Sequence, residues 1–395
     1  MSIKNNYNII QVMLDGLRTD RVNSSPSLQS IKQKSIYFSN IITAAPYTLA
    51  SLHSIFSGMH PSRNGVCGYY RLMRFKKDEI TTLPELLKEQ DYYTACDVIH
   101  DAIIPGQGFD EKGIFDEESV NFKKRHSELI ERLAKKNKKF FLFLHYTEPH
   151  KHLVDALNKT RTNVEYDESS EKNRYSDEDK FFSSIEENKK RYDSYMPELD
   201  NYVNSILNSI KTSGISDNTV IIFHSDHGTS LGEKKGEKFY GEFLYDYTIK
   251  LFSSIYIPNH TSQIIDTQCR SIDLYPTIAD IANIQTEKLD PLVQGKSLFP
   301  IIDKHEQDDR EAFVETGGLF GPWPSPEIHN VFCIRNNGKK LIYNATPETW
   351  EFYDLIKDPE EYHNLYDDHS NEISKFKERL IHHLNENGID TNISN

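Results

Sequence analysis

The sequence contains no long apolar run. No stretch approaches the roughly 20 consecutive apolar residues that a membrane-spanning helix needs. Residues 1–6 also lack the basic region, the apolar stretch and the small-residue cleavage site of a signal peptide. We therefore expect a soluble, cytoplasmic protein with no membrane insertion.

Cysteine is scarce. The chain has four cysteines, Cys67, Cys96, Cys269 and Cys333, and they are widely separated. None of them forms the CxxC or CxxH spacing that would indicate a zinc site or a redox pair. The sequence therefore predicts four reduced thiols.

An excess of basic residues is also missing. The 46 Lys and Arg residues are outnumbered by 60 Asp and Glu residues, which gives a net charge of −14. Broad nucleic-acid binding or adhesion to an anionic membrane needs a basic face, so the charge argues against both. A small anionic substrate remains compatible, because one bound metal ion can reverse the potential inside a cleft. The sequence leaves the oligomeric state open.

Three apolar segments have the pattern of buried parallel strands: residues 8–14, 140–144 and 219–223. Each is followed by chemically capable side chains, which are Asp15-Gly16 after the first strand, residues 145–150 after the second and residues 224–228 after the third. Ligands of open α/β sheets bind at the carboxyl ends of the strands. The three clusters therefore predict one shared site.

Helical patterns at residues 27–34, 83–90, 128–136 and 195–211 alternate with these strands. This alternation predicts an α/β fold with a doubly wound, mostly parallel sheet and helices on both faces. At 395 residues the chain is long enough for a smaller companion unit as well. We expect a catalytic domain over residues 1–300, in which the charged stretch 155–192 is a surface insertion or a lid. An Asn-Gly hairpin signal between residues 331–335 and 339–343 predicts a small antiparallel C-terminal subdomain over residues 301–395.

Residues 48–58 predict a short helix with Thr48 as its N-cap and Gly58 as its stop. A threonine at such a position usually only caps a helix. Asp15, Asp226 and His227 change this interpretation, because two carboxylates and an imidazole can bind a divalent cation whose shell a hydroxyl completes. A metal lowers the pKa of bound water from about 16 to about 7, and a comparable shift would make Thr48 a nucleophile.

The order of several motifs resembles that of the sulfatase family of the alkaline phosphatase superfamily, over nearly the whole chain. The motifs are Asp15-Gly16-Leu17-Arg18, Thr48 to Gly58 continuing into His60-Pro61-Ser62-Arg63-Asn64-Gly65-Val66, Ser225-Asp226-His227-Gly228, Asp273-Leu274-Tyr275-Pro276-Thr277 and Phe352-Tyr353-Asp354-Leu355.

The resemblance implies that Asp15, Asp226 and His227 bind metal and that Thr48 is both nucleophile and ligand. It places His150 where relatives have a substrate-contacting or proton-donating histidine. The alternative for His150 is an ordinary loop histidine. Expected substrate-binding residues are His145, Lys238 and Arg63, although His145 could instead be a core or second-shell residue and Lys238 a solvated lysine.

Departures from the family pattern guide the choice of reaction. Typical sulfatases oxidise a Cys or Ser to formylglycine, and this chain has Thr48 in that place. The leading hypothesis is therefore hydrolysis or transfer of a phosphoester or phosphonate. The alternatives are sulfate-ester hydrolysis on the same scaffold and a catalytically silent binding protein.

The sequence favours one metal ion over two. Two-zinc members of the superfamily need a second Asp/His/His set, and Asp200 has no histidine four residues later. We expect a single divalent ion, Mn²⁺, Mg²⁺ or Ca²⁺, with Zn²⁺ also compatible.

Overall fold

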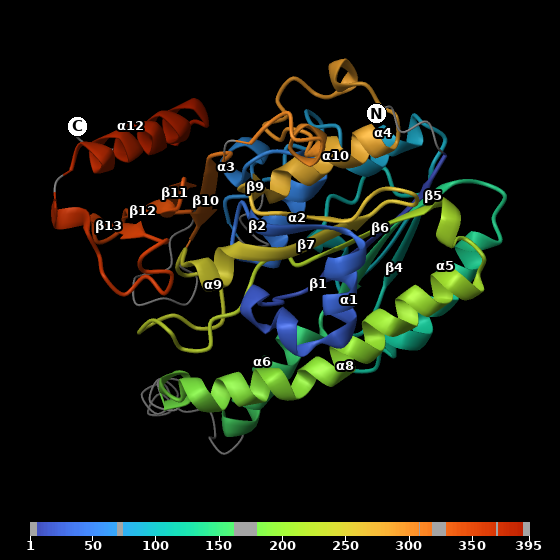
Figure 1. Ribbon diagram of the computed structural model, residues 1–395, viewed down its shortest axis with the longest axis horizontal. Coiled ribbons are helices and arrows are strands. Elements are labelled where there is room, and N and C mark those ends of the chain that lie inside the picture. The colour runs from blue at the N-terminus through green and yellow to red at the C-terminus, as the bar shows by residue number, and fades with distance from the viewer. Residues whose placement is uncertain are drawn as a thin grey trace.

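A central sheet lies between two layers of helices, and a smaller sheet with its own helix forms the C-terminal part (Figure 1). This arrangement is seen in a computed structural model that describes residues 6–68, 74–161, 180–307, 309–317, 329–368 and 370–389. Residues 162–179, the middle of the predicted insertion 155–192, lie outside the described residues. The described flanks of that insertion are helical.

The strands of the central sheet are β1 (Asn8–Leu14), β2 (Ile36–Ile42), β3 (Tyr93–Val98), β4 (Glu111–Ile114), β5 (Phe140–Tyr146), β6 (Thr219–His224), β7 (Lys250–Tyr256), β8 (Gln263–Ile265) and β9 (Cys269–Arg270). Those of the smaller sheet are β10 (Ala312–Thr316), β11 (Val331–Asn336), β12 (Lys339–Asn344) and β13 (Thr349–Asp354). The α-helices are α1 (Pro26–Lys34), α2 (Thr48–Ser57), α3 (Pro61–Asn64), α4 (Leu83–Lys88), α5 (Phe122–Ala134), α6 (Glu148–Arg161), α8 (Ile185–Thr212), α9 (Asp246–Ile249), α10 (Leu274–Ile281), α11 (Phe299–Ile302) and α12 (Asn371–Glu386).

The three strands predicted from apolar runs are neighbours in the sheet. In the described part of the chain the order is β4-β3-β5-β1-β6-β7-β2-β8, and β9 pairs with β2. Strand β1 runs parallel to both β5 and β6, with Leu14 opposite Tyr146 and Met13 opposite His224. The carboxyl ends of β1, β5 and β6 therefore meet at one edge, as predicted. Strand β7 is antiparallel to its neighbours, so the sheet is mostly parallel.

Both faces of the sheet are covered because successive side chains of a strand point to opposite sides. On β1, Ile9 and Met13 belong to a core that includes buried residues of α2, α4 and α10. Ile10, Val12 and Leu14 belong to a second core with α1, α5 and α8. These two cores confirm the doubly wound α/β architecture.

The predicted helices are present, with shifted ends. Helix α5 begins at Phe122 because the Asn121 side chain accepts from the Lys124 N–H and caps it. Strand β5 extends through Tyr146, so His145 lies inside the strand rather than after it.

One detail of the Thr48 prediction is wrong. Tyr47 is the N-cap of α2, with extended backbone angles, and Thr48 is the first residue of the helix. The Thr48 hydroxyl is directed to His227 instead of capping the helix. Gly58 ends the helix in the left-handed conformation, as predicted.

The smaller sheet confirms the predicted C-terminal antiparallel unit. Its order is β10-β11-β12-β13, and Asn337 and Gly338, both with positive φ, turn the β11–β12 hairpin. Apolar residues of α12, among them Phe376 and Leu380, pack on one face of this sheet. The domain boundary at residues 300 and 301 stays a prediction.

All four cysteines are free, and three of them are buried. Among the described residues no helix is both long and apolar enough to cross a membrane.

Gly58 provides a test of the packing between α2 and α10. Its φ is +69°, and a Cβ there would lie 2.9 Å from Val293 Cγ1 and 3.1 Å from Tyr275 Cδ1. We expect Gly58→Ala to lower the free energy of unfolding by about 3 kcal/mol, from left-handed strain and overpacking together. Urea-induced unfolding measures the loss.

Gly214→Ala is the matched control, because Gly214 has φ +71° and nothing within 4 Å of an added Cβ. We expect Gly214→Ala to lower the free energy of unfolding by about 1 kcal/mol, from left-handed backbone strain alone. Equal losses in the two variants would contradict the packing argument.

Candidate active site

Two buried carboxylates lie at the edge where β1 and β6 end. Asp15 directly follows β1, and its backbone N–H donates to the Tyr146 carbonyl at 3.0 Å. Asp226 lies two residues after β6. Their exposed fractions are 5% and 0%. The parallel pairing of β1 with β6 therefore brings the two carboxylates together inside the protein.

Each carboxylate has one oxygen held by the protein and one oxygen that accepts no hydrogen bond. His145 Nε2 donates to Asp15 Oδ2 at 3.0 Å, and the Gly16 backbone N–H donates to Asp226 Oδ1 at 3.2 Å. The other oxygens, Asp15 Oδ1 and Asp226 Oδ2, are buried without a hydrogen-bond partner. They lie 3.5 Å and 3.4 Å from His227 Nε2, so both face the same point.

His227 presents a lone pair to this point. Its Nδ1 lies 2.7 Å from the Gly228 carbonyl oxygen, which can only accept a hydrogen bond. Nδ1 therefore carries the proton and Nε2 is free to coordinate, the arrangement usual for a metal-ligating histidine. Thr48 Oγ1 lies 3.2 Å from the same Nε2. The predicted set of Asp15, Thr48, Asp226 and His227 is thus brought together.

The electrostatics of the cluster favour a cation. Burial, reinforced by the Asp226 carboxylate, raises the pKa of Asp15 well above its ordinary value. Two buried carboxylates stay ionised together only when a positive charge lies between them. Asp15, Asp226 and His227 each offer a ligand atom, and these atoms lie within 4.8 Å of one another. The residues therefore fit one divalent ion, and their oxygen-rich set suits Mn²⁺, Mg²⁺ or Ca²⁺.

Helix α2 is fixed to the metal-site loop by a second hydroxyl. Ser51 Oγ donates to the Asp226 backbone carbonyl at 2.8 Å, one turn along the helix from Thr48. Ser51 in turn lies 3.0 Å from Thr43 Oγ1. These contacts hold the N-terminus of α2, and with it Thr48, against the carboxyl end of β6.

His150 faces the cluster from the first turn of α6. Its ring centroid lies 6.5 Å from that of His227 and 4.8 Å from that of Tyr240. Its Nε2 is buried and has no hydrogen-bond partner. Burial, together with His227, lowers the pKa of His150 to about 3. The ring is therefore neutral near pH 7.

The three expected substrate-binding residues, His145, Arg63 and Lys238, make other contacts. His145 holds Asp15 and is itself buried, so the structure gives it the role of a positioning residue rather than of a substrate ligand. Arg63 Nη1 donates to the Glu386 carbonyl at 3.4 Å, at the contact between α3 and α12. Lys238 is half-buried beside Glu242, whose carboxylate accepts from the Lys238 N–H at 3.4 Å. Substrate binding by Arg63 and Lys238 stays a prediction.

Asp200 binds the N-terminus of α1. Its Oδ1 accepts from Ser25 Oγ at 2.6 Å and from the Ser27 N–H at 2.7 Å, at the N-terminus of that helix. A single metal ion at the active site stays a prediction.

Three residues that shape the site were not singled out from the sequence: Tyr240, Arg18 and Ser51. Tyr240 stacks on His227 with ring centroids 4.5 Å apart. Arg18 Nη1 donates to the Thr229 carbonyl at 2.7 Å and pairs with Glu233 at 2.6 Å, which joins the loop after β1 to the loop after β6. Ser51 holds α2 to the Asp226 carbonyl, as described above. Arg18 could have been found from its place in the Asp15-Gly16-Leu17-Arg18 motif, whereas Tyr240 has no signal in the sequence.

Comparison with known proteins supports a family assignment. The family description "Sulfatase" matches residues 8–284, and "N-sulphoglucosamine sulphohydrolase, C-terminal" matches residues 236–388. The chain is similar to an N-acetylglucosamine-6-O-sulfatase of Bacteroides thetaiotaomicron, with 30% identity over 45% of this chain and 33% of that protein. It is also similar to a choline-sulfatase of Rhizobium meliloti, with 30% identity over 47% of this chain and 35% of that protein. The matches span about a third of the length of these relatives.

Solved structures share the fold over nearly the whole chain. A protein solved with its substrate D-glucosamine-2-N,6-O-disulfate has a TM-score of 0.75 and 18% identity, and the match covers 96% of this chain and 98% of that one. The phosphonate monoester hydrolase of Agrobacterium radiobacter has a TM-score of 0.76 and 14% identity, with 96% of each chain covered.

The mostly parallel sheet and its C-terminal antiparallel unit define an alkaline-phosphatase-like fold. The chain belongs to the sulfatase family of that superfamily, because the family match covers more than half of its 395 residues. The resemblance seen in the sequence motifs is thereby confirmed.

Asp226→Asn tests the metal site. The asparagine can still accept from Gly16, but one negative charge is lost. We expect Mn²⁺ and Ca²⁺ affinity to fall by at least about 100-fold, since even outer partners of metal ligands are worth 10–100-fold. The same change should raise thermal stability in chelator, because it removes a buried like-charge repulsion.

Asp101→Asn is the control, because Asp101 also follows a strand but is 64% exposed and pairs with Lys112. Calorimetric titration and thermal unfolding in chelator are the measurements. Unchanged affinity in Asp226→Asn would refute the ligand assignment.

Proposed function

We propose that this protein cleaves an ester of a small anionic molecule, with the Thr48 hydroxyl as nucleophile beside one divalent ion. The observation that carries the proposal is the position of Thr48 Oγ1, 3.2 Å from the lone-pair nitrogen of His227. The buried oxygens of Asp15 and Asp226 that accept no hydrogen bond face the same nitrogen. A hydroxyl so placed would be a ligand and a nucleophile at once.

Two features of the site would activate Thr48. The bound ion would supply the shift in pKa that an aliphatic hydroxyl needs near neutral pH, and it would offset charge on the ester oxygens. Thr48 is also the first residue of the ten-residue helix α2, so the positive end of that helix favours an alkoxide there. The hydroxyl oxygen would attack the central atom of the ester and displace the leaving-group oxygen.

His150 would donate the proton to that leaving oxygen. The substrate-free ring is neutral because it is buried, and the charge of a bound anionic ester would shift its pKa back toward neutrality. Its Nε2 has no partner within the protein, so a substrate oxygen could take that place. Water would then release the group from Thr48 in a second step.

The substrate class has two candidates, and different observations favour them. The named relatives are mostly sulfatases, which supports a sulfate ester better than a phosphoester on kinship alone. The phosphonate hydrolase supports phosphorus chemistry only at the level of the fold. The identity of residue 48 favours a phosphoester or phosphonate, since a threonine secondary alcohol cannot be oxidised to the aldehyde of formylglycine. An unmodified Thr48 can be phosphorylated and released by water, so we propose the phosphoester or phosphonate first and the sulfate ester second.

A substrate panel with Thr48 variants tests this proposal. Turnover of matched aryl phosphodiester, phosphomonoester, phosphonate and sulfate esters is measured by release of the aryl alcohol. We expect activity on at least one phosphorus ester, its loss in Thr48→Ala and partial retention in Thr48→Ser. Thr212→Ala, a threonine change at the exposed end of α8, should leave turnover unchanged.

Multiple turnover of the sulfate ester, with no activity on any phosphorus ester, would establish the second candidate instead. Full activity of Thr48→Ala would refute the nucleophile itself.

His150→Ala tests the proton donor. We expect turnover of an alkyl ester, a poor leaving group, to fall by about 10²-fold or more, with a smaller loss on an activated aryl ester and unchanged metal content. His152→Ala is the control on the same helix, because the His152 ring lies over Tyr195 instead of the metal cluster. Equal losses on the two esters would contradict proton donation.

A further inference from the structure

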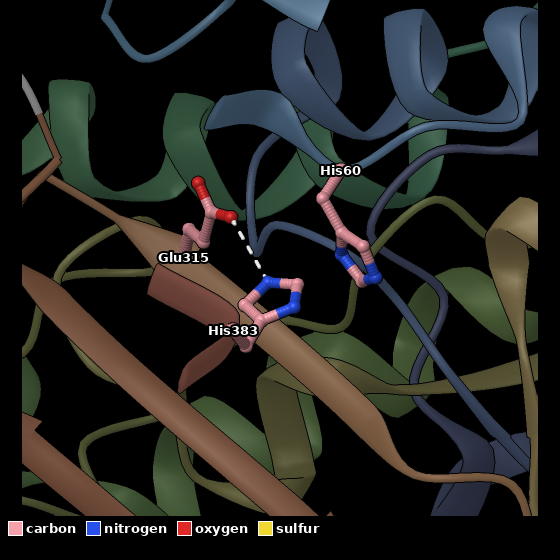
Figure 2. A group of neighbouring side chains, drawn as sticks. All are labelled: His60, Glu315 and His383. Carbon is pink, nitrogen blue, oxygen red and sulfur yellow. Dashed lines mark ion pairs between the residues drawn. The ribbon is translucent and has the colours of Figure 1, made fainter. Parts of the chain in front are cut away.

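A second cluster of metal-ligating side chains lies where the C-terminal unit meets the central domain. It consists of His60, Glu315 and His383, whose ligand atoms lie within 4.8 Å of one another. All three side chains are buried, with exposed fractions of 2%, 1% and 7%. Figure 2 shows them converging from separate parts of the chain. His60 precedes α3, Glu315 lies on β10, and His383 lies in the last turn of α12.

Two imidazole nitrogens in this cluster have no hydrogen-bond partner. They are His60 Nδ1 and His383 Nε2, and both are buried. Buried polar atoms in proteins are nearly always paired, so two such atoms beside one carboxylate require an explanation. The His383 Nε2 to Glu315 Oε1 distance is 3.7 Å, too long for a hydrogen bond. The rings of His60 and His383 meet edge to face with centroids 4.8 Å apart.

The atom types of the cluster suit a metal. His60 and His383 offer imidazole nitrogens and Glu315 offers carboxylate oxygens, all within the protein interior. Zinc accepts both kinds of ligand in proteins.

The carboxylate and one histidine ring are held in place by neighbours. Ser62 donates to Glu315 through its backbone N–H at 3.0 Å and through its hydroxyl at 2.6 Å. The His383 ring stacks on Phe313 with centroids 3.8 Å apart. Asn387 Nδ2 lies 3.4 Å from His383 Nδ1 and can donate a long hydrogen bond to it. On the far side of Glu315, His329 Nδ1 is 3.7 Å from Oε2 while its Nε2 lies 2.6 Å from the Tyr47 hydroxyl.

We propose that His60, Glu315 and His383 bind a structural Zn²⁺ ion, separate from the ion at Asp15, Asp226 and His227. Two imidazoles and one carboxylate form a set that zinc prefers, with the fourth position open to water. Zinc needs ligand atoms about 3.3–3.5 Å apart, so the three side chains would close on the ion by about 1 Å. The ion would tie the last turn of α12 to the segment that follows α2, the helix that carries Thr48.

The experiment uses the Asp226→Asn protein, so that zinc bound at the first site does not enter the count. After incubation with Zn²⁺ and dialysis, elemental analysis should give one zinc per chain. Zinc should also raise the thermal unfolding midpoint. His383→Gln in the same background should lose both effects, and His60→Gln should do the same. His382→Gln is the matched control, because His382 is the neighbouring histidine on α12 and its side chain is 73% exposed.

X-ray absorption of the zinc-loaded Asp226→Asn protein should show two imidazole ligands, and this readout decides the matter even if neither glutamine variant folds. Absence of bound zinc, retention of zinc in both His383→Gln and His60→Gln, or a spectrum without imidazole would overturn the proposal and leave a metal-free Glu315–His383 ion pair. The ester-cleaving function does not enter this test, because the Asp226→Asn background lacks an intact first site.

Discussion

Two buried carboxylates that face one another are the constraint on which the site depends. Asp15 and Asp226 follow adjacent parallel strands, so the pairing of β1 with β6 keeps the two carboxylates close together. Burial and, after it, repulsion by the Asp226 carboxylate raise the pKa of Asp15. A cation between the two carboxylates would relieve this repulsion, so the geometry of the fold favours a metal ion at this point.

The surrounding residues determine where such a cation would bind. His145 and the Gly16 N–H hold the outer oxygens of the two carboxylates, which leaves the inner oxygens directed to His227. The Gly228 carbonyl fixes the tautomer of His227. Ser51 anchors the helix that presents Thr48. The proposed nucleophile and the proposed metal ligands therefore form one rigid unit, as catalysis by a positioned charge requires.

The sequence predicted the parts of this unit that follow from periodicity. Apolar runs located β1, β5 and β6, and parallel pairing then placed Asp15, His145 and Asp226 at one edge. Helix ends were less accurate: Thr48 was expected to cap α2 but is its first residue, and α5 and α8 begin several residues before the predicted starts. For His145 the sequence left two roles open, substrate binding and a core or second-shell position, and its contact with Asp15 agrees with the second. His60, Glu315 and His383 are far apart in the chain, so no spacing rule could bring them together.

The central claim is that Thr48 acts as an unmodified hydroxyl that is esterified during turnover. It is tested most directly by quenching the enzyme in acid while it turns over a substrate and analysing the peptide that contains Thr48 by mass spectrometry. The account predicts an unmodified Thr48 before substrate is added, and a phosphoryl or phosphonyl group on its oxygen in the quenched sample. A residue already modified at rest, or rapid turnover through an adduct on a different side chain, would contradict it.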